Sequence, residues 1–168
     1  MEIAIARGTV EDLSSINAIY NHYIRNSNAT FDTEEWGVQS RLNWFQIFNK
    51  EESPYNLLVA KNKGQVVGFA YNTKFKEKKA YCTSSEVTIY IKPDMGGQGM
   101  GAKLYDALFS AIDTKTLHRL YAAITLPNAA SIRLHEKYGF ELVGTMTEVG
   151  YKNGAYHAVS LYEKSLCG

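Results

Sequence analysis

A glycine-rich segment between a strand pattern and a helix pattern constrains this chain more than any other feature. Residues 84–91, SSEVTIYI, alternate as in a strand, and Met100, Leu104 and Leu108 repeat at helical spacing. Between them, the run GGQGMG at 96–101 holds four glycines. A strand, a glycine turn and a helix start in this order expose main-chain N–H groups, and phosphate is their usual ligand. A turn without a ligand is the alternative, although one glycine would suffice for it.

The rest of the sequence predicts an α/β domain with antiparallel character in its middle. TVED at 9–12 has the spacing of a capping box, and KNKG and KNG mark hairpin turns. A second helix is expected to bury Val38, Leu42 and Phe45, with Thr33 or a neighbour as its cap. The other predicted elements are strand 3–6, a helix ending near Arg25, strands 56–61, 65–75 and 80–91, helix 100–114, strand 118–126, a short helix within 127–140 that stops at Gly139, and a hairpin over the last 28 residues.

Composition and charge narrow the class of protein. The 168 residues are 45% hydrophobic and carry a formal charge of +1, which favours one globular domain over 1–168 and gives no basic field for nucleic acid. No stretch approaches the length of a membrane span, and acidic residues come too early for a signal peptide, so a cytoplasmic location is expected. Cys82 and Cys167 are expected to be reduced thiols. Neither they nor His22, His118 and His157 have metal-ligand spacing, so no metal is predicted.

Three kinds of phosphate site compete for the glycine segment. A P-loop needs Lys followed by Ser or Thr after the glycines, and this chain has neither. A dinucleotide fold needs GxGxxG after the first strand of a parallel unit, whereas the spacing here is GxGxG after a fourth strand. The third kind is an acyl-CoA cradle between a fourth strand and a third helix.

Several motifs along the chain, including the glycine segment, resemble those of one protein family. The chain resembles the GCN5-related N-acetyltransferase (GNAT) superfamily, and within it the phosphinothricin and methionine sulfone N-acetyltransferase branch. The resemblance runs from Ile3 to about Leu161 and is carried by IYNHYI, ATFDTE, VGFAY, SSEVTIYI, GQGMG, LPNAASIRLHEKYGF and VGYKNGAYHAV. It implies the acyl-CoA N-acyltransferase fold, a mixed and mostly antiparallel sheet whose fourth and fifth strands splay apart, flanked by helices.

The resemblance also implies the ligands and the residues that bind them. Acetyl-CoA is the expected co-substrate, with its pantetheine arm along the main chain of the fourth strand and its pyrophosphate on the glycine segment. The predicted cofactor-binding residues are Ile89, Tyr90, Ile91, Gly97, Gln98, Gly99, Met100, Gly101, Ala102, Asn128 and Ser131. The predicted substrate-binding residues are Phe31, Lys76, Glu86, Val87 and Thr88.

Two positions depart from the family pattern. Gly96 stands where the family usually has Arg or Gln, which should weaken CoA binding without abolishing it, because main-chain N–H groups do most of the phosphate binding. Lys92 or Lys103 is a conjectural replacement charge. Lys76 stands where the sulfone enzymes carry Arg. A substrate carboxylate would therefore meet a flexible lysine ammonium, in place of a planar guanidinium that can donate two parallel hydrogen bonds.

Two side chains are expected to take part in the chemistry. Alternation along 84–91 puts Glu86 on the face away from Val87 and Ile89, which fits either a solvated acid or a general base. The resemblance favours the base, acting directly or through one water. Asn128, directly after Pro127, suits the N-cap of the short helix, and Ser131 and His135 follow three and seven residues later on the same helical face. By the resemblance, His135 stands where many relatives have a tyrosine that protonates the leaving thiolate. Packing beneath the cofactor without titration is the alternative for His135.

These observations predict an N-acetyltransferase that acts on a small amino acid or analogue. We expect direct attack in a ternary complex, with the main-chain N–H of Tyr90 or Ile91 on the oxyanion. The alternatives are acetylation of a protein N-terminus or an antibiotic amine, and a CoA-binding regulatory domain without turnover. A homodimer is expected from the resemblance, and no nucleic acid or membrane is expected as a partner.

Overall fold

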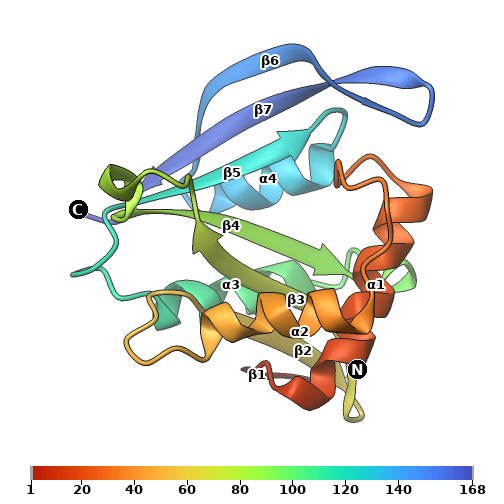
Figure 1. The fold of residues 1–168 in the computed structure, drawn as a ribbon, viewed down its shortest axis with the longest axis vertical. Helices are drawn as coiled ribbons and strands as arrows, with labels where there is room; N and C mark the ends of the chain where they lie inside the picture. Colours follow the sequence, from red (N-terminus) through yellow and green to blue (C-terminus); the bar gives the residue numbers. More distant parts are fainter. Residues whose placement is uncertain (1, 168) are drawn as a thin grey trace. The chain divides into compact units, whose positions relative to one another are not determined.

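The computed structural model describes residues 2–167, and within them seven strands form one sheet in the order β1-β2-β3-β4-β5-β7-β6 (Figure 1). The β4–β5 pair is parallel, and the pairs β1–β2, β2–β3, β5–β7 and β6–β7 are antiparallel. The predicted mixed, mostly antiparallel sheet flanked by helices is therefore confirmed. The splay of β4 and β5 stays a prediction. The strands are β1 Ile3–Arg7, β2 Leu57–Asn62, β3 Gln65–Lys74, β4 Ser84–Ile91, β5 Arg119–Thr125, β6 Glu141–Lys152 and β7 Ala155–Ser165, and the α-helices are α1 Leu13–Asn26, α2 Val38–Phe45, α3 Met100–Ala111 and α4 Ala129–Lys137.

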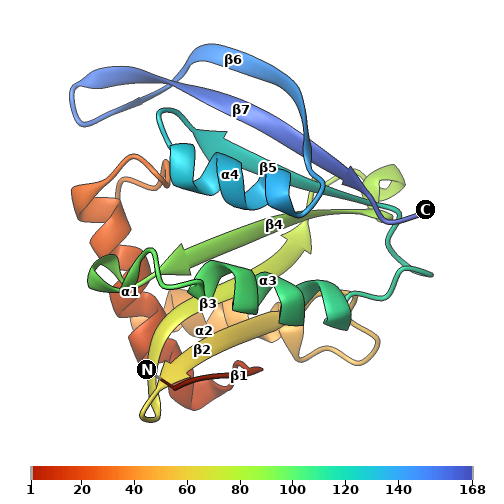
Figure 2. The same ribbon diagram turned by 180° about the vertical axis from the view of Figure 1, so that it is seen from behind.

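The described residues form two compact units. The first contains residues up to Asn21, residues 36–73 and residues 87–113. In it, helices α2 and α3 cover opposite faces of β2 and β3, as the two opposed views show (Figures 1 and 2). Helix α3 buries Met100, Leu104 and Leu108, which confirms the predicted apolar stripe.

The start of the first helix follows the predicted capping box. The main-chain N–H of Thr9 donates to Asp12 Oδ2 over 3.0 Å, and the Thr9 hydroxyl donates to the same oxygen over 3.1 Å. The other carboxylate oxygen of Asp12 pairs with Lys61 Nζ at 2.7 Å. A single 3-10 turn, Val10–Asp12, then leads into α1. The capping box therefore both begins the helix and ties it to β2.

The buried face of the second helix differs from the prediction. Its N-cap is Gly37, whereas the sequence predicted Thr33 or a neighbour of Thr33. Val38, which was predicted to be buried, is 76% exposed. The buried residues of α2 are Arg41 and Phe45. Of the predicted stripe Val38, Leu42 and Phe45, the structure buries Phe45, and Arg41 joins it in place of Val38.

The aromatic residues around Arg41 explain its burial. Its guanidinium lies over three rings, at 4.2 Å from the centroid of Trp36, 4.6 Å from that of Trp44 and 4.9 Å from that of Tyr20. Its Nε also donates to Asn17 Oδ1 over 3.0 Å. Aromatic faces attract a cation, and guanidinium is more weakly hydrated than ammonium, so burial costs less for Arg than for Lys.

The second unit contains residues 22–35, 74–86 and 114–167 of the described chain. Its strand β5 pairs with Ser84–Glu86 of β4 on one side and with β7 on the other, and helix α4 lies along β5 (Figures 1 and 2). The predicted strand 80–91 begins later than expected, at Ser84. A 3-10 turn occupies Lys79–Tyr81, where the N–H of Tyr81 donates to the carbonyl of Lys78 over 3.0 Å.

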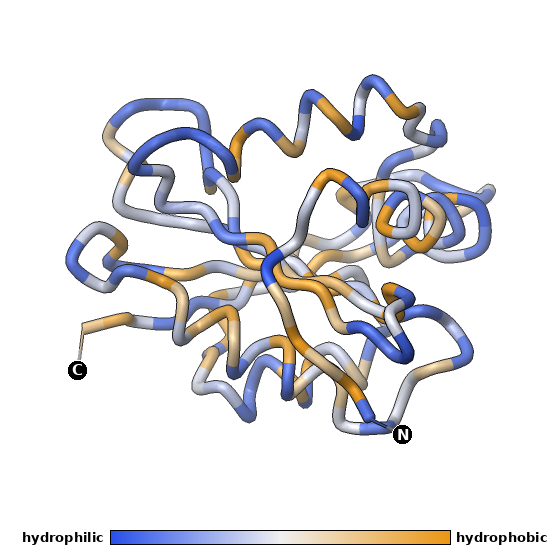
Figure 3. The backbone as a smooth tube through the Cα atoms, turned by 90° about the horizontal axis from the view of Figure 1, so that it is seen from below, coloured by the Kyte–Doolittle hydropathy of each residue, from blue (hydrophilic) through white to orange (hydrophobic). Residues whose placement is uncertain are grey.

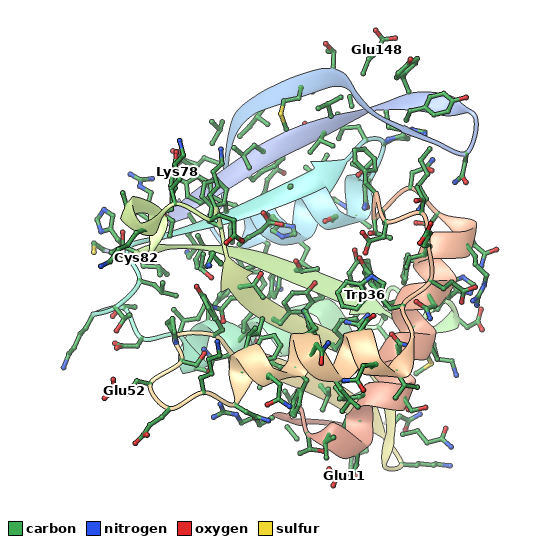
Figure 4. All side chains as sticks on the ribbon, in the orientation of Figure 1. Glu11, Trp36, Glu52, Lys78, Cys82 and Glu148 are labelled. Atoms are coloured by element: carbon green, nitrogen blue, oxygen red, sulfur yellow. The ribbon has the colours of Figure 1, made fainter. Side chains whose placement is uncertain are left out.

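The predicted terminal hairpin is confirmed, with Asn153 and Gly154 as its turn residues. Both have positive φ, 53° and 77°, as the favoured two-residue hairpin turn requires. Along β6, the register shifts between Met146 and Gly150, and Glu148 at φ 51° points outward from the strand (Figure 4). Such a bulge locally redirects a strand.

Hydrophobic and hydrophilic residues alternate along the helices, as amphipathic packing requires (Figure 3). Within residues 2–167, no helix is long and apolar enough to cross a membrane.

Candidate active site

The glycine segment of the first unit is an open loop that ends at a helix N-terminus. A 3-10 turn, Pro93–Met95, leads into it, and α3 begins at Met100. Gly97 and Gly99 have φ of 75° and 71°, the left-handed region that strains other residues. A Cβ placed on Gly96, Gly97 or Gly99 would meet no atom within 4 Å. A ligand can therefore approach this main chain closely.

The first turn of α3 adds the positive end of a helix dipole. Gly99 is the N-cap residue, and its carbonyl accepts from the N–H of Lys103 over 3.2 Å. The first turn holds no acidic residue. Met100 is buried, so its side chain anchors the helix while its main chain faces the loop. N–H groups at a helix start favour an anion such as a phosphate.

Strand β4 brings the predicted pantetheine segment beside β3 in the same unit. A Cβ on Gly68 would lie 3.3 Å from the Tyr90 carbonyl oxygen and 2.9 Å from Ile91 Cδ1, so the glycine permits the close approach of β3. Tyr90 is buried, with its ring 5.2 Å from that of Tyr20. Val87 is buried too, which leaves its main chain as the part that a ligand would meet.

In the second unit, Glu86 lies at the β4–β5 pairing, directly opposite Tyr121. Among the described residues, no hydrogen bond or ion pair reaches the Glu86 carboxylate, and burial raises its pKa above the ordinary value for Glu. A carboxylate with a raised pKa is a stronger base than an exposed one. The side chain is half-buried, so the general base and the solvated acid that the strand pattern allowed both stay predictions.

An aromatic pair and a lysine lie beside this position. The ring of Phe75 stacks on Tyr121 with centroids 4.1 Å apart and planes 16° apart. Lys76 Nζ lies 5.5 Å from the centroid of Phe75 and 5.7 Å from that of Tyr81. The second unit thus brings Lys76 near the Glu86 position through Phe75 and Tyr121. No pattern in the sequence indicated Tyr121, because its place opposite Glu86 depends on the register of two strands that are distant in the chain.

Asn128, Ser131 and His135 form one connected group on α4. The Asn128 side chain accepts from the N–H of Ser131 over 3.1 Å, which confirms the predicted N-cap. His135 Nδ1 lies 2.8 Å from the Ser131 carbonyl oxygen and 3.3 Å from its hydroxyl. A carbonyl oxygen only accepts, so Nδ1 carries the proton. The shared helical face predicted for these three residues is therefore present.

Burial decides the charge state of His135. The side chain is 3% exposed, and its ring meets Phe140 edge-on with centroids 5.2 Å apart. Burial lowers the pKa of His135, although the hydrogen bond to Ser131 opposes this shift. The lowered pKa favours the neutral imidazole, and the proton-donor and packed roles of His135 both stay predictions.

Phe31, the remaining predicted substrate residue of the second unit, belongs to the loop after α1. Its ring packs against the terminal hairpin, and the residue is 37% exposed. Its ring contacts the main chain at Gly150 and lies 6.4 Å from the ring of His157. Tyr151 and Tyr156 pair with each other on the same hairpin and are exposed. Among residues 2–167, no group of three or more His, Cys, Asp or Glu side chains is placed to hold a metal ion.

Comparison of the sequence with known protein families identifies the family of this chain. The sequence matches the acetyltransferase (GNAT) domain over residues 5–159. The chain therefore belongs to the GNAT acetyltransferase family, which confirms the superfamily that the sequence motifs indicated.

Individual relatives narrow the branch. The chain is 42% identical over 167 residues to a phosphinothricin N-acetyltransferase of Streptomyces coelicolor, covering 98% of this chain and 97% of that protein. It is 32% identical to an L-methionine sulfoximine/L-methionine sulfone acetyltransferase of Pseudomonas aeruginosa, covering 99% and 96%. A crystal structure of a phosphinothricin acetyltransferase from Sinorhizobium meliloti in complex with acetyl-CoA matches with a TM-score of 0.90 at 28% identity, covering 99% and 89%. The predicted branch is therefore confirmed.

Proposed function

We propose that this protein transfers an acetyl group from acetyl-CoA to the amine of a small amino acid or analogue of the phosphinothricin or methionine sulfone type. The observation that carries the proposal is the half-buried carboxylate of Glu86, whose pKa is raised by desolvation and which lies beside an aromatic pair and Lys76. The names of the relatives support the substrate class. The family match runs through segments of both compact units, which supports a single N-acetyltransferase domain over 1–168.

The glycine segment fits the pyrophosphate of acetyl-CoA. Open space in front of Gly96, Gly97 and Gly99 leaves their main chain accessible, and the α3 start supplies positive partial charge. In the proposal, N–H groups of residues 97–102 bind the pyrophosphate, and the main chain of Ile89–Ile91 pairs with the pantetheine amides. Asn128 and Ser131 contact the same arm.

Direct transfer accounts for the chemistry with these residues. Glu86 takes a proton from the substrate ammonium, and the free amine nitrogen attacks the thioester carbonyl carbon. The new C–N bond forms, and the oxyanion is stabilised by the N–H of Tyr90 or Ile91. The C–S bond then breaks, and the proton that the new amide nitrogen loses goes to the leaving thiolate, which departs as CoA thiol. Because burial raises the pKa of Glu86, its basicity moves closer to what deprotonation of an amine requires.

The neutral state of His135 suits a positioning role in this proposal. Its Nδ1–H bond to Ser131 ties the middle of α4 to the first turn, which Asn128 caps. Substitution of His135 by Phe or Gln is therefore expected to act on the binding of acetyl-CoA more than on the rate at saturation.

Lys76 and the rings around it are proposed to hold the acceptor. The Lys76 ammonium would attract the acceptor's carboxylate as a point charge, and Phe75 and Tyr121 would contact its side chain. Phe31, Val87 and Thr88 complete the proposed acceptor residues.

The edge strand β6 supports the proposed homodimer. It ends the sheet, and it exposes four apolar side chains, namely Leu142, Val143, Met146 and Val149. Exposed apolar surface on an edge strand favours pairing with another chain. Light scattering on the purified protein tests this, and a monomer in wild type, or a dimer unaltered by Val143→Lys, would contradict a β6 interface. We also propose a cytoplasmic location, because acetyl-CoA is a co-substrate found inside cells.

The function is tested by measuring release of CoA thiol from acetyl-CoA with free amino acids, methionine sulfone, methionine sulfoximine and phosphinothricin as acceptors. Acceptor-dependent release that collapses in Glu86→Gln supports the reaction and the base. Undiminished release in that variant removes Glu86 from the role. If none of these acceptors causes release of CoA thiol but peptides do, the acceptor is a protein N-terminus. CoA binding without transfer to any acceptor would favour a regulatory domain.

A further inference from the structure

Phe31 occupies the space that a side chain on the hairpin would need. Gly150 of β6 lies directly opposite His157 of β7, so the two positions share one face of the hairpin. The ring of Phe31 lies over this pair. A Cβ on Gly150 would come within 2.2 Å of Phe31 Cε2 and 2.6 Å of Cζ. Real Cβ atoms do not approach other atoms so closely, so even alanine at 150 would displace the ring or the strand.

A buried lysine holds the loop that carries Phe31. Lys152 follows Gly150 by two residues and therefore points to the same face. It is 5% exposed, and its Nζ donates to the carbonyl oxygens of Ser27 at 2.9 Å and Thr30 at 2.8 Å. Both acceptors belong to the loop 27–32. A charged donor on two carbonyls makes stronger hydrogen bonds than neutral pairs do.

The hairpin turn adds two contacts beside this tether. Asn153 Nδ2 donates to Asn28 Oδ1 over 2.8 Å. His157 Nε2 lies 2.8 Å from the Lys152 carbonyl oxygen and donates to it, which fixes the end of β6 from the facing strand. Lys152 is thus held at its main chain while its ammonium holds the loop.

The loop itself is folded by local turns on either side of Phe31. The N–H of Ala29 donates to the Ser27 hydroxyl over 2.8 Å, and that of Asp32 donates to the Thr30 hydroxyl over 3.2 Å. Such turns set the direction of the main chain. The tether at Ser27 and Thr30 therefore fixes the residue between Thr30 and Asp32.

We propose that Gly150 and Lys152 are positioning residues for acceptor specificity: they hold loop 27–32 on the hairpin so that the Phe31 ring forms a fixed apolar wall for the acceptor's side chain. This inference rests on the proposed function, which places Phe31 in the acceptor site. A fixed ring selects acceptors by shape, because no cost of ordering the loop is paid on binding. A displaced ring loses that selection.

Steady-state kinetics of Gly150→Ala and Lys152→Met test the proposal, with matched controls from the same hairpin. Gly144→Ala lies on β6 where an added Cβ meets nothing within 4 Å, and Lys164→Met removes another lysine-to-carbonyl bond, to Tyr138. Each test variant is expected to raise the acceptor KM about tenfold, a 1.4 kcal/mol effect, with the acetyl-CoA KM unchanged. The two controls are expected to leave the acceptor KM unchanged.

A double variant shows whether Gly150 acts through Phe31. In a Phe31→Leu background, Gly150→Ala is expected to add little, because the ring it displaces is already gone. An additive effect, or acceptor KM values that do not separate the test variants from the controls, overturns the inference.

Hydrogen exchange gives a readout that does not depend on turnover. Amides of residues 27–33 are expected to exchange faster in Lys152→Met than in wild type or Lys164→Met. Unchanged exchange of these amides in Lys152→Met overturns the inference that Lys152 holds the loop, even if the protein is active. If the amides exchange faster in Lys152→Met but the wild-type protein acetylates no acceptor, Lys152 does hold the loop and only the proposed function is removed.

Discussion

Placing arginine at position 96 should strengthen CoA binding. Gly96 has φ −67° and ψ 161°, an extended conformation that any residue adopts, and its Cβ position is open to 4 Å. Gly96→Arg therefore introduces neither backbone strain nor a clash. The new guanidinium would stand at the loop that we propose binds the pyrophosphate.

The expected gain is small, since the arginine would remain exposed to solvent. Exposed ion pairs contribute about 0.2–1 kcal/mol, which corresponds to about 1.5- to 5-fold in the dissociation constant. The gain should also shrink with salt, because the screening length falls from about 10 Å at 0.1 M to about 3 Å at 1 M ionic strength.

Isothermal titration calorimetry with CoA at both ionic strengths measures this effect. Gly96→Ala is the matched control, which changes the backbone entropy but adds no charge, and Gly96→Glu should weaken binding. An arginine variant that binds no more tightly than wild type at low salt would refute the reasoning. Equal gains from Ala and Arg would assign the effect to the backbone and not to charge.

Three further changes test the site. Glu86→Gln should lower kcat/KM by about 10²- to 10⁴-fold. In wild type, kcat/KM should fall at acidic pH with a midpoint above about 4.3, the ordinary pKa of Glu, and the variant should lack this fall. If the variant still shows it, another group is responsible. Because the folded-state pKa of Glu86 is raised, its contribution to stability is present at low pH and lost as pH rises through that value, so the variant should melt higher than wild type at neutral pH. Gly97→Ala, at φ 75°, should cost about 1–2 kcal/mol in the loop that we propose binds CoA. CoA binding in calorimetry should weaken by up to about thirtyfold, and unchanged affinity would mean that the loop relaxes freely. Asn128→Ala removes the α4 cap and should lower the free energy of unfolding in urea by about 0.5–2 kcal/mol, whereas an unchanged midpoint would show that the cap is replaced.

The sequence predicted those features that depend on residues close together in the chain. The capping box joins Thr9 to Asp12, the Asn128 cap reaches Ser131, and the hairpin turn is set by Asn153 and Gly154. Each depends on hydrogen bonds or backbone preferences that act over a few residues. The strand, glycine turn and helix that form the proposed cofactor loop are of the same kind, so the candidate cofactor site was predictable in outline.

The burial of Arg41 could not be predicted from the sequence, because its surroundings come from three separate segments. Its rings, Tyr20, Trp36 and Trp44, lie on α1, on the loop before α2 and on α2 itself. A hydrophobic pattern counts an arginine as polar, whereas a cluster of aromatic faces makes it a core residue. The buried face of α2 therefore could not be read from periodicity alone.

By itself, the sequence determined the order of strands and helices, the glycine turn between a strand and a helix, and the family resemblance. The tertiary structure decided that Glu86 is half-buried opposite Tyr121 with a raised pKa, that His135 is buried with a lowered pKa, and that Phe31 fills the space above Gly150. The physical reason is that desolvation and close packing depend on atoms brought together from distant parts of the chain, which no local pattern encodes.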